Sequence, residues 1–140
     1  MGIDAYNFVS CLNCVAAQRL VRKICVHCKQ PVSYNRQAFE ESGLDYDRYG
    51  QHSFFKGAGC RECNGQGFHG RTAIVELLDM DDNLRDMIVS KASVSHLKDA
   101  ARAAGTSFLR DSAVEKLLNG VTTLEEINRV TFAEPFGGGA

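Results

Sequence analysis

The sequence lacks the features by which secreted, membrane-spanning and phosphate-binding proteins are usually recognised. Its first residues contain no basic segment followed by an apolar run, so they do not resemble a signal peptide. No stretch approaches the roughly 20 apolar residues that a membrane helix requires. The phosphate-binding pattern G-x-x-x-x-G-K-[ST] is absent, and no Ser/His/Asp set or carboxylate pair stands out. We therefore expect a cytoplasmic chain without catalytic residues of its own.

Acidic residues are missing from one long segment of an otherwise balanced chain. The net charge is −1 and 24% of the residues are charged, which argues against nucleic acid as a partner. No acidic residue occurs between Asp4 and Glu40, and the same window contains the cations Arg19, Arg22, Lys23, Lys29 and Arg36. Two interpretations remain open. These cations offset the charge of a nearby metal–thiolate centre, or they form a surface that recognises an acidic partner.

Six cysteines form three Cys-x-x-Cys pairs, and two of these pairs predict a metal site. Cys25 and Cys28 form one pair, and Cys60 and Cys63 form the other. In a reducing compartment such pairs usually bind metal, and four thiolates can surround a zinc ion tetrahedrally. A disulfide or redox role is the alternative, but a thioredoxin-like site would use a single pair. We predict one structural zinc ion, with His27 less favoured as a ligand because four sulfurs already close the site.

The third pair, Cys11 and Cys14, is expected to be structural. It lies in the segment 6–20, where apolar residues recur with a helical period and neither glycine nor proline interrupts them. Residues three apart on a helix have Cβ atoms about 5–6 Å apart, which disfavours an unstrained disulfide. We expect one helix from an Asp4 N-cap to the basic residues 19–23, with both thiols buried.

The remaining patterns divide the chain into four parts. Residues 1–24 should be the N-terminal helix, and residues 25–70 a metal-held lobe with too few apolar residues to fold without its ion. Residues 71–132 should form a strand followed by a bundle of short helices, and residues 133–140 a flexible tail.

Capping residues and glycines place the individual elements within this division. We predict a helix at 35–42, strands at 53–56 and 71–78, and helices that begin near Asp81, Ser93 or Ser95, Phe108 and Thr123. Thr123 and Glu126 have the spacing of a capping box. The expected fold class is mainly α with a small β element, in which a zinc-stapled tetracysteine lobe precedes a compact helical bundle.

Several segments carry a resemblance to one protein family. They are residues 17–28, 59–71, 76–78, 101–105 and 120–131. In the same order, they resemble the C-terminal part of the bacterial secretion ATPases, the hexameric motors of type II secretion and type IV pilus assembly. The likeness extends over residues 1–132. The chain departs from the family pattern at Val26, where proline is frequent, and at Cys11 and Cys14, where small or aliphatic residues are usual.

The resemblance implies a C-terminal portion of a RecA-like motor domain that follows the last catalytic box. ATP and magnesium would then belong to the parent protein, and the fragment itself would be non-catalytic. It further implies a cytoplasmic location at the inner membrane, contacts with neighbouring subunits, and docking of the zinc lobe on the platform protein. Arg22, Lys23, Lys29 and Arg61 lie near the cysteines in sequence and are the candidate docking residues. Pilus assembly and type II secretion are not separated by these motifs.

Free-standing zinc modules are the alternative class. Residues 60–67 match the Cys-x-x-Cys-x-Gly-x-Gly repeat of DnaJ-type co-chaperones, although that family has four such repeats and this chain has one. A zinc ribbon that binds nucleic acid is disfavoured by the near-neutral charge. We therefore expect the secretion-motor fragment and keep a free-standing zinc module as the alternative.

Overall fold

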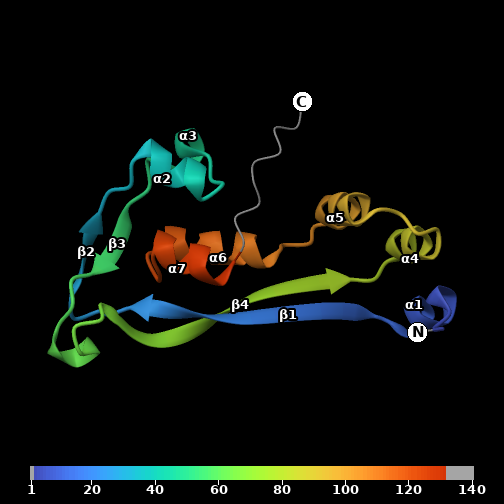
Figure 1. Cartoon of the computed structure of the whole chain (residues 1–140), viewed down its shortest axis with the longest axis horizontal. Helices are drawn as coiled ribbons and strands as arrows, with labels where there is room; N and C mark the ends of the chain where they lie inside the picture. Colours follow the sequence, from blue (N-terminus) through green and yellow to red (C-terminus); the bar gives the residue numbers. More distant parts are fainter. Residues whose placement is uncertain (1, 132–140) are drawn as a thin grey trace. The chain divides into compact units, whose positions relative to one another are not determined.

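The computed structural model describes residues 2–131, and the chain divides into two compact units (Figure 1). Unit 1 combines Met1–Gln18 with Val75–Phe108, and unit 2 combines Arg19–Ile74 with Leu109–Ala140. Each unit has its own cluster of buried apolar side chains. None of the helices described is long and apolar enough to cross a membrane. The predicted tail, 133–140, lies outside the described residues.

The N-terminal segment is a short helix followed by a long strand. Helix α1 (Ala5–Cys11) begins where the Asp4 carboxylate accepts a hydrogen bond, as predicted. Strand β1 (Cys14–Ile24) then pairs with strand β4 (Phe68–Asp79). The prediction of one helix over residues 1–24 is therefore wrong. The apolar period of this segment is compatible with a helix, but a distant strand supplies its backbone hydrogen bonds, and tertiary pairing overrides the local pattern.

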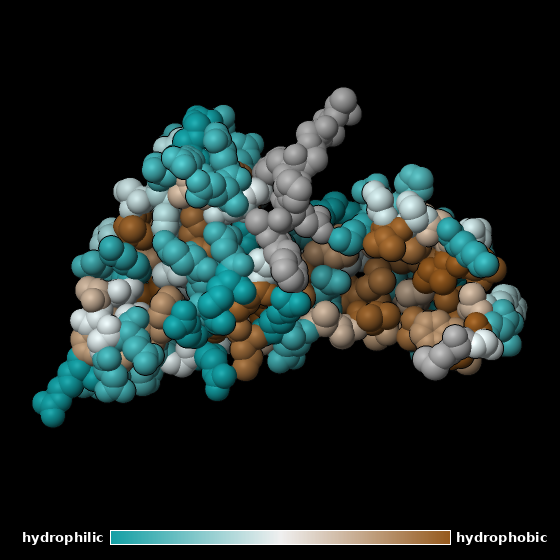
Figure 2. Space-filling model, viewed as in Figure 1, coloured by the Kyte–Doolittle hydropathy of each residue, from teal (hydrophilic) through white to brown (hydrophobic). Residues whose placement is uncertain are grey.

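Unit 1 has a small core and much exposed apolar surface. Helices α4 (Asp82–Val89) and α5 (Val94–Ala103) begin at the N-caps Asp81 and Ser93, as predicted. The buried residues of its core are Met80, Leu84 and Ala101. Brown, hydrophobic surface gathers over α4 and α5 in Figure 2, whereas the surface over α2 and α3 is mostly hydrophilic.

Unit 2 contains the cysteine-rich lobe and the last two helices. Its elements are β2 (Lys29–Val32), α2 (Arg36–Glu41), α3 (Tyr46–Tyr49), β3 (Phe54–Gly57), the 3₁₀ turn η1 (Arg61–Cys63), α6 (Leu109–Leu118) and α7 (Leu124–Val130). The predicted helix at 35–42 and strand at 53–56 are confirmed as α2 and β3. Phe39 and Phe54 of the lobe are buried with Leu117 and Ile127 of the last helices. The lobe thus shares an apolar core with α6 and α7.

The four C-terminal helices contribute to two different apolar cores. Helices α4 and α5 contribute to the core of unit 1, and α6 and α7 contribute to the core of unit 2. The helices that were expected in one bundle are thus divided between two cores. Short connections predicted that consecutive helices pack together, but they carry no information on which core each apolar face enters.

Candidate metal centre

The hairpin of β2 and β3 brings the two cysteine pairs together. The strands are antiparallel, with Lys29 opposite Gly57. Cys28 comes directly before β2 and Cys60 comes three residues after β3, so both pairs lie at the same end of the hairpin. The Ala58 N–H donates to the Cys28 carbonyl at 3.0 Å and continues the pairing up to the site. The strand register therefore accounts for the meeting of segments 31 residues apart.

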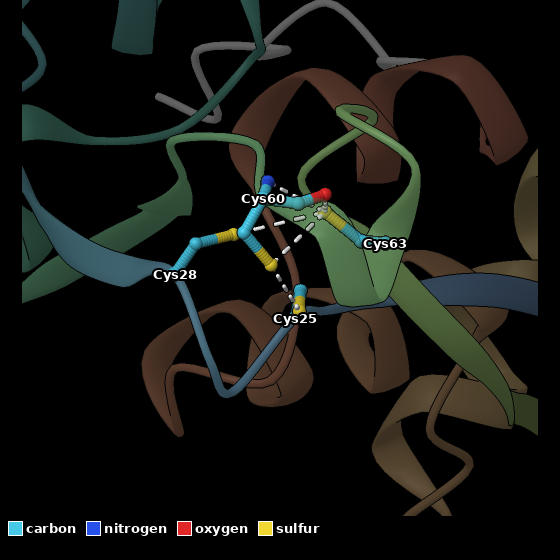
Figure 3. Close-up of side chains that lie close together, drawn as sticks. All are labelled: Cys25, Cys28, Cys60 and Cys63. Carbon is cyan, nitrogen blue, oxygen red and sulfur yellow. Dashed lines mark hydrogen bonds between the residues drawn. The ribbon is translucent and has the colours of Figure 1, made fainter.

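The four sulfur atoms lie within 4.8 Å of one another (Figure 3). The Sγ–Sγ distances are 3.8 Å for Cys25 and Cys60, 3.8 Å for Cys28 and Cys63, and 3.7 Å for Cys60 and Cys63. A regular tetrahedron with Zn–S bonds of about 2.3 Å has sulfurs about 3.8 Å apart. The observed distances fit a tetrathiolate metal site, and they are nearly twice the S–S bond of about 2.05 Å in a disulfide.

Backbone N–H groups point at two of the sulfurs. The Gly59 N–H donates to Cys28 Sγ at 3.3 Å, and the N–H groups of Cys60 and Gly67 donate to Cys63 Sγ at 3.2 Å each. The N–H of Cys60 is the main cause that lowers the pKa of Cys63, whereas burial raises the pKa of Cys28. Such donors stabilise an anionic sulfur, which is the form that binds a cation.

Two glycines allow the backbone to pass close to itself beside the sulfurs. A Cβ atom on Gly57 would lie 2.0 Å from the Gly67 carbonyl oxygen, and a Cβ on Gly67 would lie 2.6 Å from that of Gly57. Gly67 also has φ of +77°, which disfavours other residues. Its carbonyl accepts the Cys25 N–H at 3.0 Å. Side chains at either glycine would therefore push the two cysteine pairs apart.

The cluster contains the four predicted ligands and does not include His27. Cys25 and Cys63 are buried, and Cys28 and Cys60 are half-buried.

Cys11 and Cys14 lie outside the cluster, and both are exposed. The prediction that they are core residues is wrong, because one ends α1 and the other begins β1 rather than lying on the buried face of a long helix.

The chain matches the model of a family described as "Type II/IV secretion system protein" over residues 1–129. It belongs to this family. The match covers both units, including the cysteine cluster, and it confirms the resemblance noted in the sequence.

Curated relatives agree with this assignment. The chain is 38% identical over 128 residues to a type IV pilus assembly ATPase, PilB, of Myxococcus xanthus, covering 91% of this chain and 23% of that protein. It is 40% identical over 127 residues to PilB of Thermus thermophilus, covering 91% of this chain and 14% of the relative. It is also 40% identical over 134 residues to a type II secretion system protein E of Pseudomonas aeruginosa, covering 96% of this chain and 26% of the relative. The chain thus spans about a quarter or less of each relative.

The four candidate docking cations differ in their surroundings. The Arg22 guanidinium is paired with the Glu126 carboxylate of α7 at 2.9 Å. Lys29 Nζ donates to the Gly120 carbonyl at 2.7 Å. Both side chains therefore fasten the hairpin end of unit 2 to its last helices. Lys23, Lys29 and Arg61 are all exposed, but the Lys29 ammonium is already held by the Gly120 carbonyl. Of the four, Lys23 and Arg61 are the better placed to meet another molecule.

Glu126 was expected from the sequence only as part of a capping box, but the structure places its carboxylate in buried ion pairs. Its N–H donates to Thr123 Oγ1 at 3.2 Å, as in a capping box, but its own side chain turns inward and is 0% exposed. Burial raises its pKa, yet the hydrogen bonds of Arg129 and Arg22 outweigh this effect and lower it to about 2. Arg22 precedes Cys25 by three residues, so this ion pair ties the first cysteine turn to α7. Arg129, three residues after Glu126, was the sequence feature that could have indicated an ion pair at this carboxylate.

Proposed function

We propose that this chain is the zinc-binding C-terminal portion of a hexameric ATPase that powers type IV pilus assembly or type II protein secretion. The family match over residues 1–129 carries the assignment to the motor. The relatives are described as pilus assembly ATPases and type II secretion proteins, and both kinds match at comparable identity. A free-standing zinc module is less well supported, because the match extends far beyond the cysteine repeat.

In this proposal the parent protein binds ATP and magnesium, and the present chain is non-catalytic. It contributes stability, contacts with neighbouring subunits and a docking surface for the inner-membrane platform protein. The motor would be cytoplasmic and peripheral to that membrane. Nucleic acid is not a proposed partner, since the charge of the chain is close to neutral.

A zinc ion bound by Cys25, Cys28, Cys60 and Cys63 is the proposed structural staple of unit 2. Sulfur spacing near 3.8 Å supports zinc, as do the N–H groups aimed at two sulfurs. With four protein ligands the coordination is closed, so the metal would hold the hairpin end and not activate water.

Docking is proposed to use Lys23 and Arg61, two exposed cations near the cysteines. The test is charge reversal of both residues to Glu in the full-length motor, with pilus assembly or secretion as the readout. Reversal of Lys91 and Lys98, two exposed cations of unit 1, is the matched control.

If zinc content and folding are retained while assembly fails only in the first variant, docking by these residues is supported. Normal assembly with Lys23 and Arg61 reversed would refute docking, and the cysteine lobe would then serve as a staple alone.

A further inference from the structure

We propose that Arg22 and Arg129 form a binding site for a phosphate group, with Glu126 holding both guanidinium groups in position. This goes beyond the proposed function, which assigns anion binding to no residue of this chain. The site lies in unit 2, where β1 meets α7.

The hydrogen bonds at Glu126 leave guanidinium donors available. Arg22 donates from Nε at 3.1 Å and Nη2 at 2.9 Å, and Arg129 donates from Nε at 2.9 Å and Nη2 at 2.6 Å. The Arg22 backbone N–H adds a fifth bond at 3.0 Å. A carboxylate has about four lone-pair sites, so Glu126 is saturated. Each guanidinium has about five N–H donors and uses two here, which leaves three on each.

The two side chains that carry the remaining donors are partly exposed to solvent. The side chains of Arg22 and Arg129 are 42% and 57% exposed, whereas Glu126 is fully buried. Within residues 2–131, the remaining donors of these two guanidinium groups have no further hydrogen-bond partner. Arg19 contributes a third cation nearby, because its Nη1 donates to the Val130 carbonyl. Two cations therefore hold the buried carboxylate, and the third contacts the C-terminal end of α7.

The guanidinium groups of Arg22 and Arg129 are held in position before an anion binds, which favours binding here more than at an ordinary surface arginine. Both guanidinium planes are fixed by two bonds each, and Arg22 also lies over the Phe68 ring at 4.3 Å. Less side-chain entropy is then lost on binding an anion.

A phosphate matches the site better than a single carboxylate does. It carries up to two negative charges and several acceptor oxygens, so it can engage both guanidinium forks at once. Inorganic phosphate and the terminal phosphate of a nucleotide present the same chemistry to the site.

The test is a titration of the zinc-loaded chain with inorganic phosphate, observed through the Nε–Hε signals of its arginines by NMR. At constant ionic strength, the signals of Arg22 and Arg129 should shift and saturate with phosphate, and should shift much less with acetate. Arg36 is an internal control, since its guanidinium is paired one-to-one with Asp47 at 2.7 Å. Shifts at Arg22 and Arg129 that do not exceed those at Arg36 would overturn the proposal and leave an adventitious ion only.

A conservative variant tests the guanidinium fork. Arg129→Lys keeps the charge beside Glu126 but loses the fork, so phosphate should bind about tenfold more weakly. Arg36→Lys should bind phosphate as the wild type does. Zinc content and circular dichroism establish that both variants are folded. If Arg129→Lys is folded and retains full phosphate affinity, the proposal is wrong. If this variant does not fold, the phosphate-induced shifts of Arg22 and Arg129 in the wild type, compared with those of Arg36, still test the proposal.

The source of the phosphate is distinguished by repeating the titration with pyrophosphate and ATP. Tighter binding of ATP than of inorganic phosphate indicates a nucleotide, and equal binding indicates free phosphate; both results support a phosphate site. Binding of ATP that leaves the Arg22 and Arg129 signals unmoved contradicts it.

Discussion

Replacement of Glu126 by Gln should destabilise the fold more than any other single change of charge on α7. The pKa of Glu126 is lowered from 4.5 to about 2. A shift of one pKa unit corresponds to about 1.4 kcal/mol, so ionisation of this carboxyl contributes about 3 kcal/mol at neutral pH. The Gln side chain has a similar shape but cannot accept the charged bonds of Arg22 and Arg129 equally well. We expect a loss of about 3 kcal/mol.

The assay is urea unfolding of the zinc-loaded chain, followed by circular dichroism at pH 7. Glu125→Gln is the matched control, because Glu125 is adjacent and exposed, and its carboxylate accepts a bond from Tyr34 at 2.9 Å. That control should lose at most about 1 kcal/mol. Equal losses for the two variants would show that Glu126 does not form the stabilising ion pair described.

The pH dependence of this effect has a definite sign. Because folding lowers the pKa of Glu126, its contribution is complete above about 4.5 and is lost as the pH falls towards 2. The difference in stability between the wild type and Glu126→Gln should therefore be constant from pH 6 to pH 8. A difference that changes across this range would contradict the lowered pKa.

Three further outcomes are expected. Gly57→Ala should abolish metal binding, because its Cβ would lie 2.0 Å from the Gly67 carbonyl oxygen. Gly65→Asn should retain metal binding, since Gly65 has open space and a φ of +77° that Asn tolerates. Equal zinc content in both variants would contradict this expectation. Phe39→Ala should cost about 3–5 kcal/mol in urea unfolding even with metal bound, because Phe39 belongs to the core shared with α6 and α7; a negligible loss would mean that the ion alone holds the lobe. The isolated chain should show no ATP turnover in a phosphate-release assay, and turnover that disappears on mutation of a residue in this chain would contradict a non-catalytic role.

The features predicted correctly from the sequence depend on local chemistry. The spacing of the cysteines identified the four residues whose sulfurs cluster. Short polar side chains before apolar runs placed helix starts, as at Asn35, Asp81 and Ser93. In each case the interacting groups lie within a few residues of one another, or belong to a motif with fixed spacing.

The features that were missed depend on partners distant in sequence. β1 is a strand because β4 pairs with it, and that partner is not visible in residues 14–24. Glu126 is buried because Arg22 reaches it from 104 residues away. The exposure of Cys11 and Cys14 follows from the same error, since a helix was expected where the chain becomes extended. Local periodicity cannot supply such long-range information.

Zinc analysis of the purified chain tests the central claim most directly. Elemental analysis should find one zinc ion per chain in the wild type and in Cys11→Ser, whose thiol lies outside the cluster. Cys63→Ser should lose the ion, because the substitution removes one of the four sulfur ligands. The lost sulfur is also the one that accepts two backbone N–H groups. A wild-type zinc content near zero, with four free and reactive thiols in the cluster, would contradict the account.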